Sequence, residues 1–242
     1  MRGLTVGVSV GVIVSMGACG NDMPTDPDGP NGTGETCTAA PADESGEGTY
    51  YDATGAGNCS FDPTPSDLMV AAMNAPDYAS AAWCGACVAV NGPRGSVTVR
   101  IVDQCPGCAK GALDLSPQAF AKLADLSAGR IPITWREVAC DVSGPVAYHH
   151  KDATSQYYTA IQIRNHRYPI ATLEAKDAGG AWHAVPRKDY NYFVPAAALG
   201  PGPYALRVTD TRGQTVEDDA VPLMPNTTVA GVAQFATCPW PG

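Results

Sequence analysis

The 242-residue sequence predicts a mostly β protein with an export leader and two folded units. Its 26 glycines and 21 prolines indicate many turns, and apolar runs with helical spacing are few. Hydrophobic residues make up 45% of the chain, which is enough for real cores. Nine cysteines indicate a fold tied by disulfides in an oxidising compartment.

The N-terminus has the features of an export signal. Arg2 is followed by an uncharged, apolar stretch over residues 3–16, which is too short for a lasting membrane span. The stretch ends in Met16-Gly17-Ala18-Cys19, which resembles a bacterial lipobox with Cys19 as the lipid-bearing residue; simple cleavage and release is the alternative. We therefore predict a signal peptide over residues 1–19 and an extracellular or surface-bound protein that touches a membrane only through a lipid.

Residues 20–44 form an acidic tether that is rich in proline and glycine. This segment contains six acidic residues and no lysine or arginine. Of the formal net charge of −9, Arg2 contributes +1 and the tether −6, which leaves −4 for residues 45–242. The folded part is thus mildly acidic, and this balance argues against nucleic acid as a partner.

Removing Cys19 leaves eight cysteines, an even number that suits four disulfides. The segments Cys84-Gly85-Ala86-Cys87 and Cys105-Pro106-Gly107-Cys108 would also suit a four-cysteine zinc site, but export disfavours zinc. The four histidines show no metal-ligand spacing on a shared element. No metal and no other cofactor is expected.

The first folded unit, residues 45–142, is predicted to be a small, disulfide-tied barrel with two short helices. Alternating apolar residues predict strands over 97–102 and 131–138. Ser116 as a cap and Pro117 at the first helical position predict a helix over 117–126. Thr64-Pro65, ahead of apolar residues at 68, 69, 72 and 73, predicts a weaker second helix.

The second unit, residues 146–237, shows a purely β pattern. Residues 160–164 and 205–209 alternate in polarity, and turn signals occur at 177–180 and 210–213. Strands of this length and spacing predict a β-sandwich of about 90 residues. The connection at Ser143-Gly144-Pro145 is short, so the two units are expected to pack as one body.

Two aspartates in the segment 102–117 are the strongest candidates for chemistry. Leu113 and Leu115 flank Asp114 with strand-like alternation, so leucines that face the core would leave the carboxylate on the opposite side of the sheet. Asp103 ends an alternating apolar run beside a turn, which is a common place for functional residues. The alternative is that both aspartates form turns or cap helices.

Five motifs follow one another across both units: Gly48-Thr49-Tyr50, Val102-Asp103 with the segment 111–117, Trp135-Arg136, the segment 161–169 (IQIRNHRYP) and the segment 189–193 (DYNYF). Together they resemble the expansin family, bacterial expansins in particular, over most of residues 46–236. The resemblance implies an all-β chain: a six-stranded double-psi β-barrel with short helices, followed by an immunoglobulin-like, carbohydrate-binding β-sandwich. It also implies a shallow groove for wall polysaccharide.

The resemblance implies groove residues in the first unit. Thr49, Tyr50, Asp103 and Asp114 fall in the groove motifs, and Asp114 matches the aspartate that the family requires for wall loosening. Bacterial members often have a tyrosine two residues beyond the first aspartate, where this chain has Cys105. One wall of the groove is therefore expected to differ.

In the second unit the resemblance implies a row of sugar-stacking aromatics. Tyr157, Tyr158 and Tyr190 fall where the family has this row, with tryptophan common at the first two positions, and Lys151 matches a basic residue beside it. Tyrosine in place of tryptophan is expected to lower the affinity for the polysaccharide. From the strand pattern alone, neighbouring tyrosines would instead point to opposite faces, one buried and one exposed.

The resemblance also suggests disulfide pairs. Two pairs have family support, and the remaining cysteines would then form a tight local loop and a link between the two ends of the folded body. The expected pairs are Cys59 with Cys84, Cys87 with Cys140, Cys105 with Cys108, and Cys37 with Cys238.

The predicted function is that of a non-catalytic, expansin-like monomer that binds cellulose, xylan or peptidoglycan and loosens chain-to-chain contacts. One alternative is an endoglucanase like those of glycoside hydrolase family 45, with Asp114 as the acid and Asp52 as the base. A second is a peptidoglycan lytic transglycosylase of the rare-lipoprotein type. A third is an adhesin that binds cellulose and whose groove has no wall-loosening role.

Overall fold

The computed structural model describes residues 1, 3, 37 and 42–238. The predicted signal peptide, the lipid site at Cys19 and nearly all of the acidic tether lie outside the described residues. From Cys37 onward the described residues belong to one compact unit. Within the described part of the chain, none of the helices has the length and apolar character needed to cross a membrane.

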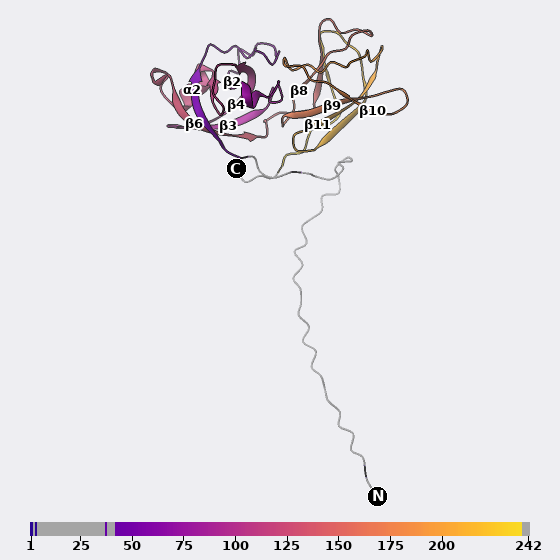
Figure 1. Ribbon diagram of the computed structural model, residues 1–242, viewed down its shortest axis with the longest axis horizontal. Helices are drawn as coiled ribbons and strands as arrows, with labels where there is room; N and C mark the ends of the chain where they lie inside the picture. Colours follow the sequence, from indigo (N-terminus) through magenta and orange to yellow (C-terminus); the bar gives the residue numbers. More distant parts are fainter. Residues whose placement is uncertain (2, 4–36, 38–41, 239–242) are drawn as a thin grey trace. The chain divides into compact units, whose positions relative to one another are not determined.

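Six strands close into a barrel in the order β1-β5-β2-β4-β3-β6 (Figure 1). They are β1 (Glu44–Tyr50), β2 (Val70–Asn74), β3 (Cys87–Gly92), β4 (Gly95–Cys105), β5 (Leu113–Leu115) and β6 (Ile131–Val138). The pairs β1-β5 and β2-β4 are parallel, and the other four are antiparallel. The two strands predicted in this unit are confirmed as β4 and β6.

The barrel core follows from period-2 patterns in the strands. In β6, Ile131, Ile133 and Trp135 are buried and alternate with more exposed residues, as expected for a strand with one face on the core. The indole Nε1 of buried Trp135 donates to the carbonyl oxygen of Gly111 at 2.8 Å. A large ring therefore fills the core without leaving its polar atom unsatisfied.

The helix predicted after Thr64-Pro65 is wrong. Residues 70–74 form β2 instead, and all five are buried: Ala71 and Met73 face the barrel core, and Val70 packs in a second cluster on the other face. A strand buried on both faces shows no alternation, so its apolar residues matched helical spacing by chance. The short helix in this region is α1 (Ala75–Tyr78), where the Asn74 side chain accepts the Asp77 N–H.

The helix predicted after Ser116 is confirmed as α2 (Pro117–Leu123). The Ser116 hydroxyl accepts the N–H of Ala119 at 3.1 Å, and Phe120 and Leu123 are buried on one face. The helix is three residues shorter than predicted because the chain continues into a separate 3₁₀ turn, η1 (Leu126–Ala128). The α2 helix packs its apolar face into the barrel cluster.

The second half of the chain forms two antiparallel sheets. One has the order β10-β9-β11-β12 and the other β13-β7-β8. The strands are β7 (Ala147–His150), β8 (Ile161–Arg164), β9 (Ile170–Lys176), β10 (Trp182–Val185), β11 (Tyr204–Asp210), β12 (Thr215–Val221) and β13 (Thr227–Ala230). Tyr148 and Ile163 of one sheet share a hydrophobic cluster with Leu173 and Leu206 of the other. The strands predicted over 160–164 and 205–209 are confirmed as β8 and β11.

All four predicted disulfides are present. They join Cys37 to Cys238, Cys59 to Cys84, Cys87 to Cys140, and Cys105 to Cys108. The zinc alternative is wrong, because all four of its proposed ligands are bonded in disulfides. Cross-links of this kind restrict the unfolded chain and so stabilise the fold.

The partly buried side chain of Asp77 links α1 to the turn before β5. Its side chain is 11% exposed and accepts hydrogen bonds from Lys110 Nζ at 2.5 Å, Asn74 Nδ2 at 2.8 Å and Gly111 N–H at 2.9 Å. Burial acts to raise the pKa of Asp77, but these donors outweigh it and hold the pKa below its ordinary value.

We expect Asp77→Asn to lower the free energy of unfolding by about 1.5–3 kcal/mol at pH 7, because a neutral amide accepts these bonds poorly. A lowered carboxyl pKa adds stability above the unfolded pKa of about 3.9, and that stability is lost as pH falls through the lower folded value. Urea unfolding at pH 7 and below pH 3 measures both effects, with exposed Asp219→Asn as control. Equal acid sensitivity of wild type and Asp77→Asn would contradict the assignment.

Candidate functional site

The two predicted groove aspartates lie in one register row across four barrel strands. Thr49 of β1 pairs with Asp114 of β5, Asp114 with Ala72 of β2, and Ala72 with Asp103 of β4. Adjacent strands lie about 4.8 Å apart, so the two aspartates are separated by roughly 10 Å at Cα. Ala72 between them carries only a methyl group and is itself buried.

Asp114 faces away from the barrel core, as its alternation with leucines predicts. Leu113 and Leu115 are fully buried, whereas Asp114 is partly exposed. The hydroxyl of Thr49 donates to Asp114 Oδ1 at 2.5 Å. A residue on the neighbouring strand thus orients one oxygen of this carboxylate and leaves the other available to a ligand.

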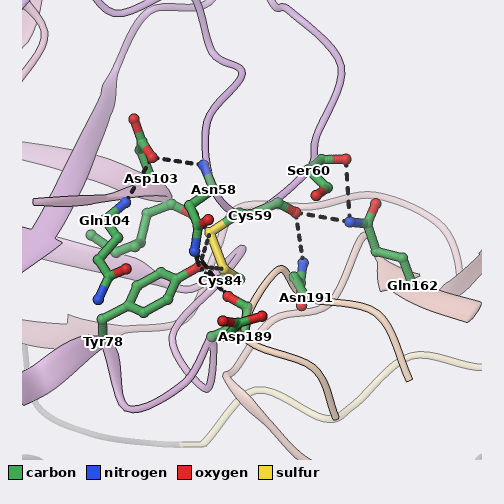
Figure 2. Close-up of a disulfide and its surroundings, with 12 residues drawn as sticks. Asn58, Cys59, Ser60, Tyr78, Cys84, Asp103, Gln104, Gln162, Asp189 and Asn191 are labelled. Carbon is green, nitrogen blue, oxygen red and sulfur yellow. Dashed lines mark hydrogen bonds between the residues drawn. A yellow bond between two sulfur atoms is a disulfide. The ribbon is translucent and has the colours of Figure 1, made fainter. Parts of the chain in front are cut away.

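Asp103 is held by backbone donors. Its Oδ1 accepts the N–H of Asn58 at 2.6 Å and the N–H of Gln104 at 2.8 Å (Figure 2). The segment before Asn58 approaches so closely that a Cβ on Gly57 would lie 2.3 Å from Asp103 Cγ. Only glycine allows this approach, so the loop between β1 and β2 is fitted to the Asp103 carboxylate.

Tyr50 does not join this group, which corrects the prediction made for it. Its ring packs on Phe120 with centroids 4.9 Å apart, and its hydroxyl donates to the Leu126 carbonyl oxygen at 3.2 Å. Neighbouring residues of a strand point to opposite faces, so Tyr50 lies on the other side of β1 from Thr49.

Tyr51 takes the place that was expected for Tyr50. Burial and the nearby charges of Asp103 and Asp114 raise its pKa far above the ordinary value, so the phenol keeps its proton. The hydroxyl is buried beside Asp103 and has no well-aligned hydrogen-bond partner among the described residues. Sequence analysis missed Tyr51, although continuing the alternation from Thr49 would have placed it on the groove side.

Asp52, the base of the endoglucanase alternative, is exposed. It makes no hydrogen bond or ion pair with any residue that the structure describes, and so no contact brings it to Asp114. The partly exposed groups of this arrangement are the Asp103 and Asp114 carboxylates and the Thr49 hydroxyl, which are of the kind that can hydrogen-bond to sugar hydroxyls.

The predicted tyrosines of the second half are exposed together. Tyr157 is 80% exposed and Tyr158 is 40% exposed. They lie in a turn closed by two hydrogen bonds between the backbones of Ser155 and Tyr158, not in a strand. The strand-based alternative, with one ring buried and one exposed, is therefore wrong.

Tyr190 and Lys151 lie beside this turn. Partial burial and the neighbouring Tyr158 hydroxyl raise the pKa of Tyr190, while the charge of Lys151 acts in the opposite direction. Both residues surround Tyr192, with ring centroids of Tyr190 and Tyr192 6.0 Å apart and Lys151 Nζ 5.6 Å from the Tyr192 centroid. The structure thus brings Tyr190 and Lys151 together around the buried ring of Tyr192, which was not predicted as part of the site, and places Tyr158 beside Tyr190. We call Tyr157, Tyr158, Tyr190 and Lys151 the tyrosine surface.

Asn58 connects the Asp103 carboxylate to the tyrosine surface. Its backbone N–H holds Asp103, and its side-chain Nδ2 donates to Tyr78 Oη and to the carbonyl oxygen of Asp189, both at 2.9 Å (Figure 2). The Tyr78 hydroxyl also donates to the Asp189 carbonyl at 3.2 Å. Asp189 directly precedes Tyr190, so one asparagine touches both parts of the candidate site.

Cys59 extends this connection. Its carbonyl oxygen accepts Gln162 Nε2 at 2.8 Å and Asn191 Nδ2 at 3.2 Å, and its sulfur is bonded to Cys84 (Figure 2). Cys59, Gln162 and Asn191 are all buried. The residues on both sides of Tyr190 are therefore tied to the barrel. We call Asn58, Cys59, Tyr78, Asp189 and Asn191 the Asn58 junction.

We expect Asn58→Ala to loosen the tyrosine surface without unfolding the barrel. The backbone donor to Asp103 stays, but two side-chain hydrogen bonds are lost and Tyr78 loses a partner, which lowers the free energy of unfolding by about 1–3 kcal/mol. Hydrogen–deuterium exchange should rise in residues 189–192 and change little in β4 and β6. Exposed Asn91→Ala is the control; unchanged exchange at 189–192 would refute the connection.

Comparisons with known proteins agree with this geometry. Residues 69–135 match a double-psi β-barrel family model described as lytic transglycolase. Expansin-YoaJ of Bacillus subtilis (strain 168) is 40% identical over 185 residues, which cover 72% of this chain and 78% of that protein. Expansin-like protein 2 of Dictyostelium discoideum is 32% identical over 203 residues, which cover 79% of this chain and 50% of that protein.

Solved structures of the Clavibacter michiganensis expansin are similar to this chain. The apo form is 35% identical with a TM-score of 0.75, and a point mutant in complex with cellohexaose is 33% identical with a TM-score of 0.76. Each comparison covers 81% of this chain and 100% of the other. The similarity thus includes both the barrel and the paired sheets. On the strength of these relatives, the chain belongs to the expansin family.

Proposed function

We propose that this protein loosens cell walls without hydrolysis, by binding a wall polysaccharide and weakening its contacts with neighbouring chains. The observation that carries the proposal is the pairing of a Thr49-oriented Asp114 with an exposed tyrosine surface. The expansin relatives act on the wall, so the working place is outside the cell or at its surface.

The mechanism uses contacts that need no covalent step. Asp114 and Asp103 accept hydrogen bonds from sugar hydroxyls, and the buried Tyr51 phenol lies beside Asp103 beneath them. The rings of Tyr157 and Tyr158 offer flat apolar area to the CH face of a sugar chain. A glucan held at both places exchanges contacts with its neighbours for contacts with the protein. The endoglucanase alternative needs Asp52 across the bond from Asp114, and no described contact puts Asp52 there.

Cellulose is the first polysaccharide that we propose as a ligand. The support is the similar Clavibacter michiganensis expansin, which has been solved in complex with cellohexaose. Xylan is a further neutral candidate. The acidic net charge of the chain disfavours charged, pectin-rich walls, because like charges repel.

Peptidoglycan is the second class of ligand that we propose. The support is the barrel segment 69–135, which matches the model described as lytic transglycolase. Incubation with purified sacculi separates binding from cleavage. Sedimentation of the protein with sacculi supports a ligand role. Release of anhydro-muropeptides would show that the protein cleaves peptidoglycan, and would contradict the proposed non-hydrolytic function.

We also propose a domain organisation for the whole chain. Residues 1–19 are a signal peptide that ends in a lipidated Cys19, 20–44 a tether, 45–142 the double-psi barrel, and 146–237 an immunoglobulin-like, carbohydrate-binding β-sandwich. The two antiparallel sheets with a shared hydrophobic cluster support the last assignment. The protein works as a monomer in this scheme.

Asp114→Asn should abolish wall loosening and change cellulose binding less than about twofold, since the tyrosine surface supplies most of the contact area. The measurement is extension of heat-inactivated wall strips under constant load, with a reducing-sugar assay on the same sample. Asp52→Asn is the matched control and should loosen walls like the wild type. Loosening by Asp114→Asn would refute the role of this carboxylate, and Asp52-dependent sugar release would establish an endoglucanase.

Tyr157 tests the stacking role because it is the most exposed ring of the tyrosine surface. We expect Tyr157→Ala to weaken cellulose binding by about 1 kcal/mol, or roughly fivefold, and Tyr157→Trp to strengthen it, because the larger ring adds contact area. Depletion isotherms on microcrystalline cellulose measure both. Val232→Ala, at an exposed apolar residue, is the control. Equal cellulose affinities of the wild type, Tyr157→Ala and Tyr157→Trp would exclude a stacking role for this position.

A further inference from the structure

A cavity of about 430 Å³ lies apart from the groove aspartates. Its walls come from the loop between β1 and β2, the outer face of β4, and the turn after β8. Neither Asp103 nor Asp114 lines it, and no residue of the tyrosine surface does. Its volume is in the range of roughly 300–1,000 Å³ that is typical of small-molecule sites.

Arg100 is the most informative residue of this cavity. It projects from β4 between buried Val99 and Ile101, and its guanidinium carbon lies 5.5 Å from the centroid of Phe61. Partial burial lowers the pKa of Arg100, and the charge of Asp67 acts in the opposite direction. Among the described residues, no acceptor forms a hydrogen bond or ion pair with this guanidinium. None of its nitrogens is among the fully buried polar atoms without a partner, so these donors open into the cavity, where solvent or a ligand accepts from them.

The neighbouring guanidinium of Arg164, unlike that of Arg100, has hydrogen-bond acceptors within the protein. It donates to Asp62 Oδ2 at 2.7 Å and to Gln162 Oε1 at 2.5 Å, and it also lies near Phe61, at 5.9 Å from the centroid. Two cations therefore share one aromatic ring, but only one of them has carboxylate and amide partners. The donors of Arg100 are left for a group inside the cavity.

His166 supplies the complementary acceptor. The residue is 3% exposed and lines the cavity, and its Nδ1 lies 2.7 Å from the carbonyl oxygen of Tyr168. Burial lowers the pKa of His166 to about 4, so the ring is neutral at pH 7. Nδ1 then carries the proton and Nε2 is an acceptor. Within the described residues Nε2 has no donor.

The charges that face the cavity are nearly balanced. Arg100 and Arg164 stand against the carboxylates of Asp62, Asp67 and Asp141. A balanced lining selects neither a strong anion nor a cation. Phe61, Met69 and Val142 add apolar wall. Hydroxyl groups both donate and accept, so a ligand with several of them would satisfy Arg100 and His166 at once.

We propose that this cavity binds a single uncharged sugar residue, carried as a side branch of a wall polysaccharide. The proposal rests on the proposed function in that the branch belongs to a polymer held on the tyrosine surface. Arg164 connects the two places: its Nε donates to Gln162 Oε1, Gln162 pairs with His149 of β7, and the His149 ring lies 6.3 Å from the Tyr192 ring beneath that surface. The main chain would lie across the tyrosines while a branch enters the cavity.

The test is a nuclear magnetic resonance titration of the full-length protein with free xylose, arabinose and galactose. Glucuronate and inorganic phosphate are titrated in parallel as anionic ligands for comparison. We expect saturable shifts of the Arg100 Nε–H and His166 ring signals with at least one neutral sugar. Arg100→Met should weaken that sugar at least about tenfold, because charge-assisted hydrogen bonds are lost. The matched control is Arg94→Met, whose guanidinium pairs with Asp125 at an exposed position.

A second variant keeps the proposal testable if Arg100→Met fails to fold. Val142→Trp fills the cavity without removing a donor and should also abolish the shifts. No saturable shift with any neutral sugar overturns the proposal, as do shifts with glucuronate or phosphate alone. Wild-type affinity in both variants overturns it too.

The wall-extension assay keeps the two hypotheses separate. The cavity is supported as a distinct site if the Arg100→Met variant loosens cellulose walls normally but no longer binds the free sugar. Failure of the wild type to loosen walls, with sugar binding intact, would overturn the proposed function and with it the side-branch assignment.

Discussion

The site depends on Asn58, which holds a barrel carboxylate with its backbone and the tyrosine-bearing loop with its side chain. The Asn58 N–H lies 2.6 Å from Asp103 Oδ1, and Nδ2 lies 2.9 Å from the Asp189 carbonyl oxygen. The next residue, Cys59, is cross-linked and accepts two further side-chain donors. Breaking one of the two bonds to the Cys59 carbonyl leaves a buried amide group unsatisfied, which costs about 1–3 kcal/mol. The two halves of the site are thus coupled.

Such coupling matters for a protein that changes polymer packing without covalent chemistry. Each hydrogen bond to a sugar contributes only about 1 kcal/mol net, so a glucan leaves its neighbours only where many contacts are already in place. A buried ion pair between Glu137 of β6 and Arg212 adds a second link, at 2.6 Å, between barrel and paired sheets. Burial raises the pKa of Glu137, and Arg212 acts in the opposite direction. The binding surface is therefore preorganised rather than assembled on contact.

The features that could be predicted from sequence are those with a local cause. Alternation predicted β6 and the outward direction of Asp114, and the Ser116-Pro117 pair predicted the start of α2. The β2 strand was mistaken for a helix because a strand buried on both faces has no period of two. Asn58 carried no local signal, since its partners Tyr78 and Asp189 lie 20 and 131 residues away.

The loop between β1 and β2 contributes to the candidate groove, to the Asn58 junction and to the proposed cavity site. Tyr51 reaches the groove aspartates, Asn58 forms the junction, and Phe61 carries the two guanidinium groups of the cavity. This loop contains no strand of its own. It is held by backbone bonds from Tyr51 N–H to Leu115 O and from Cys59 N–H to Val102 O, by the Cys59–Cys84 disulfide, and by the contact of Gly57 with Asp103. Substitutions in the loop would alter all three features while the six barrel strands stay intact, so one barrel can serve different wall polymers.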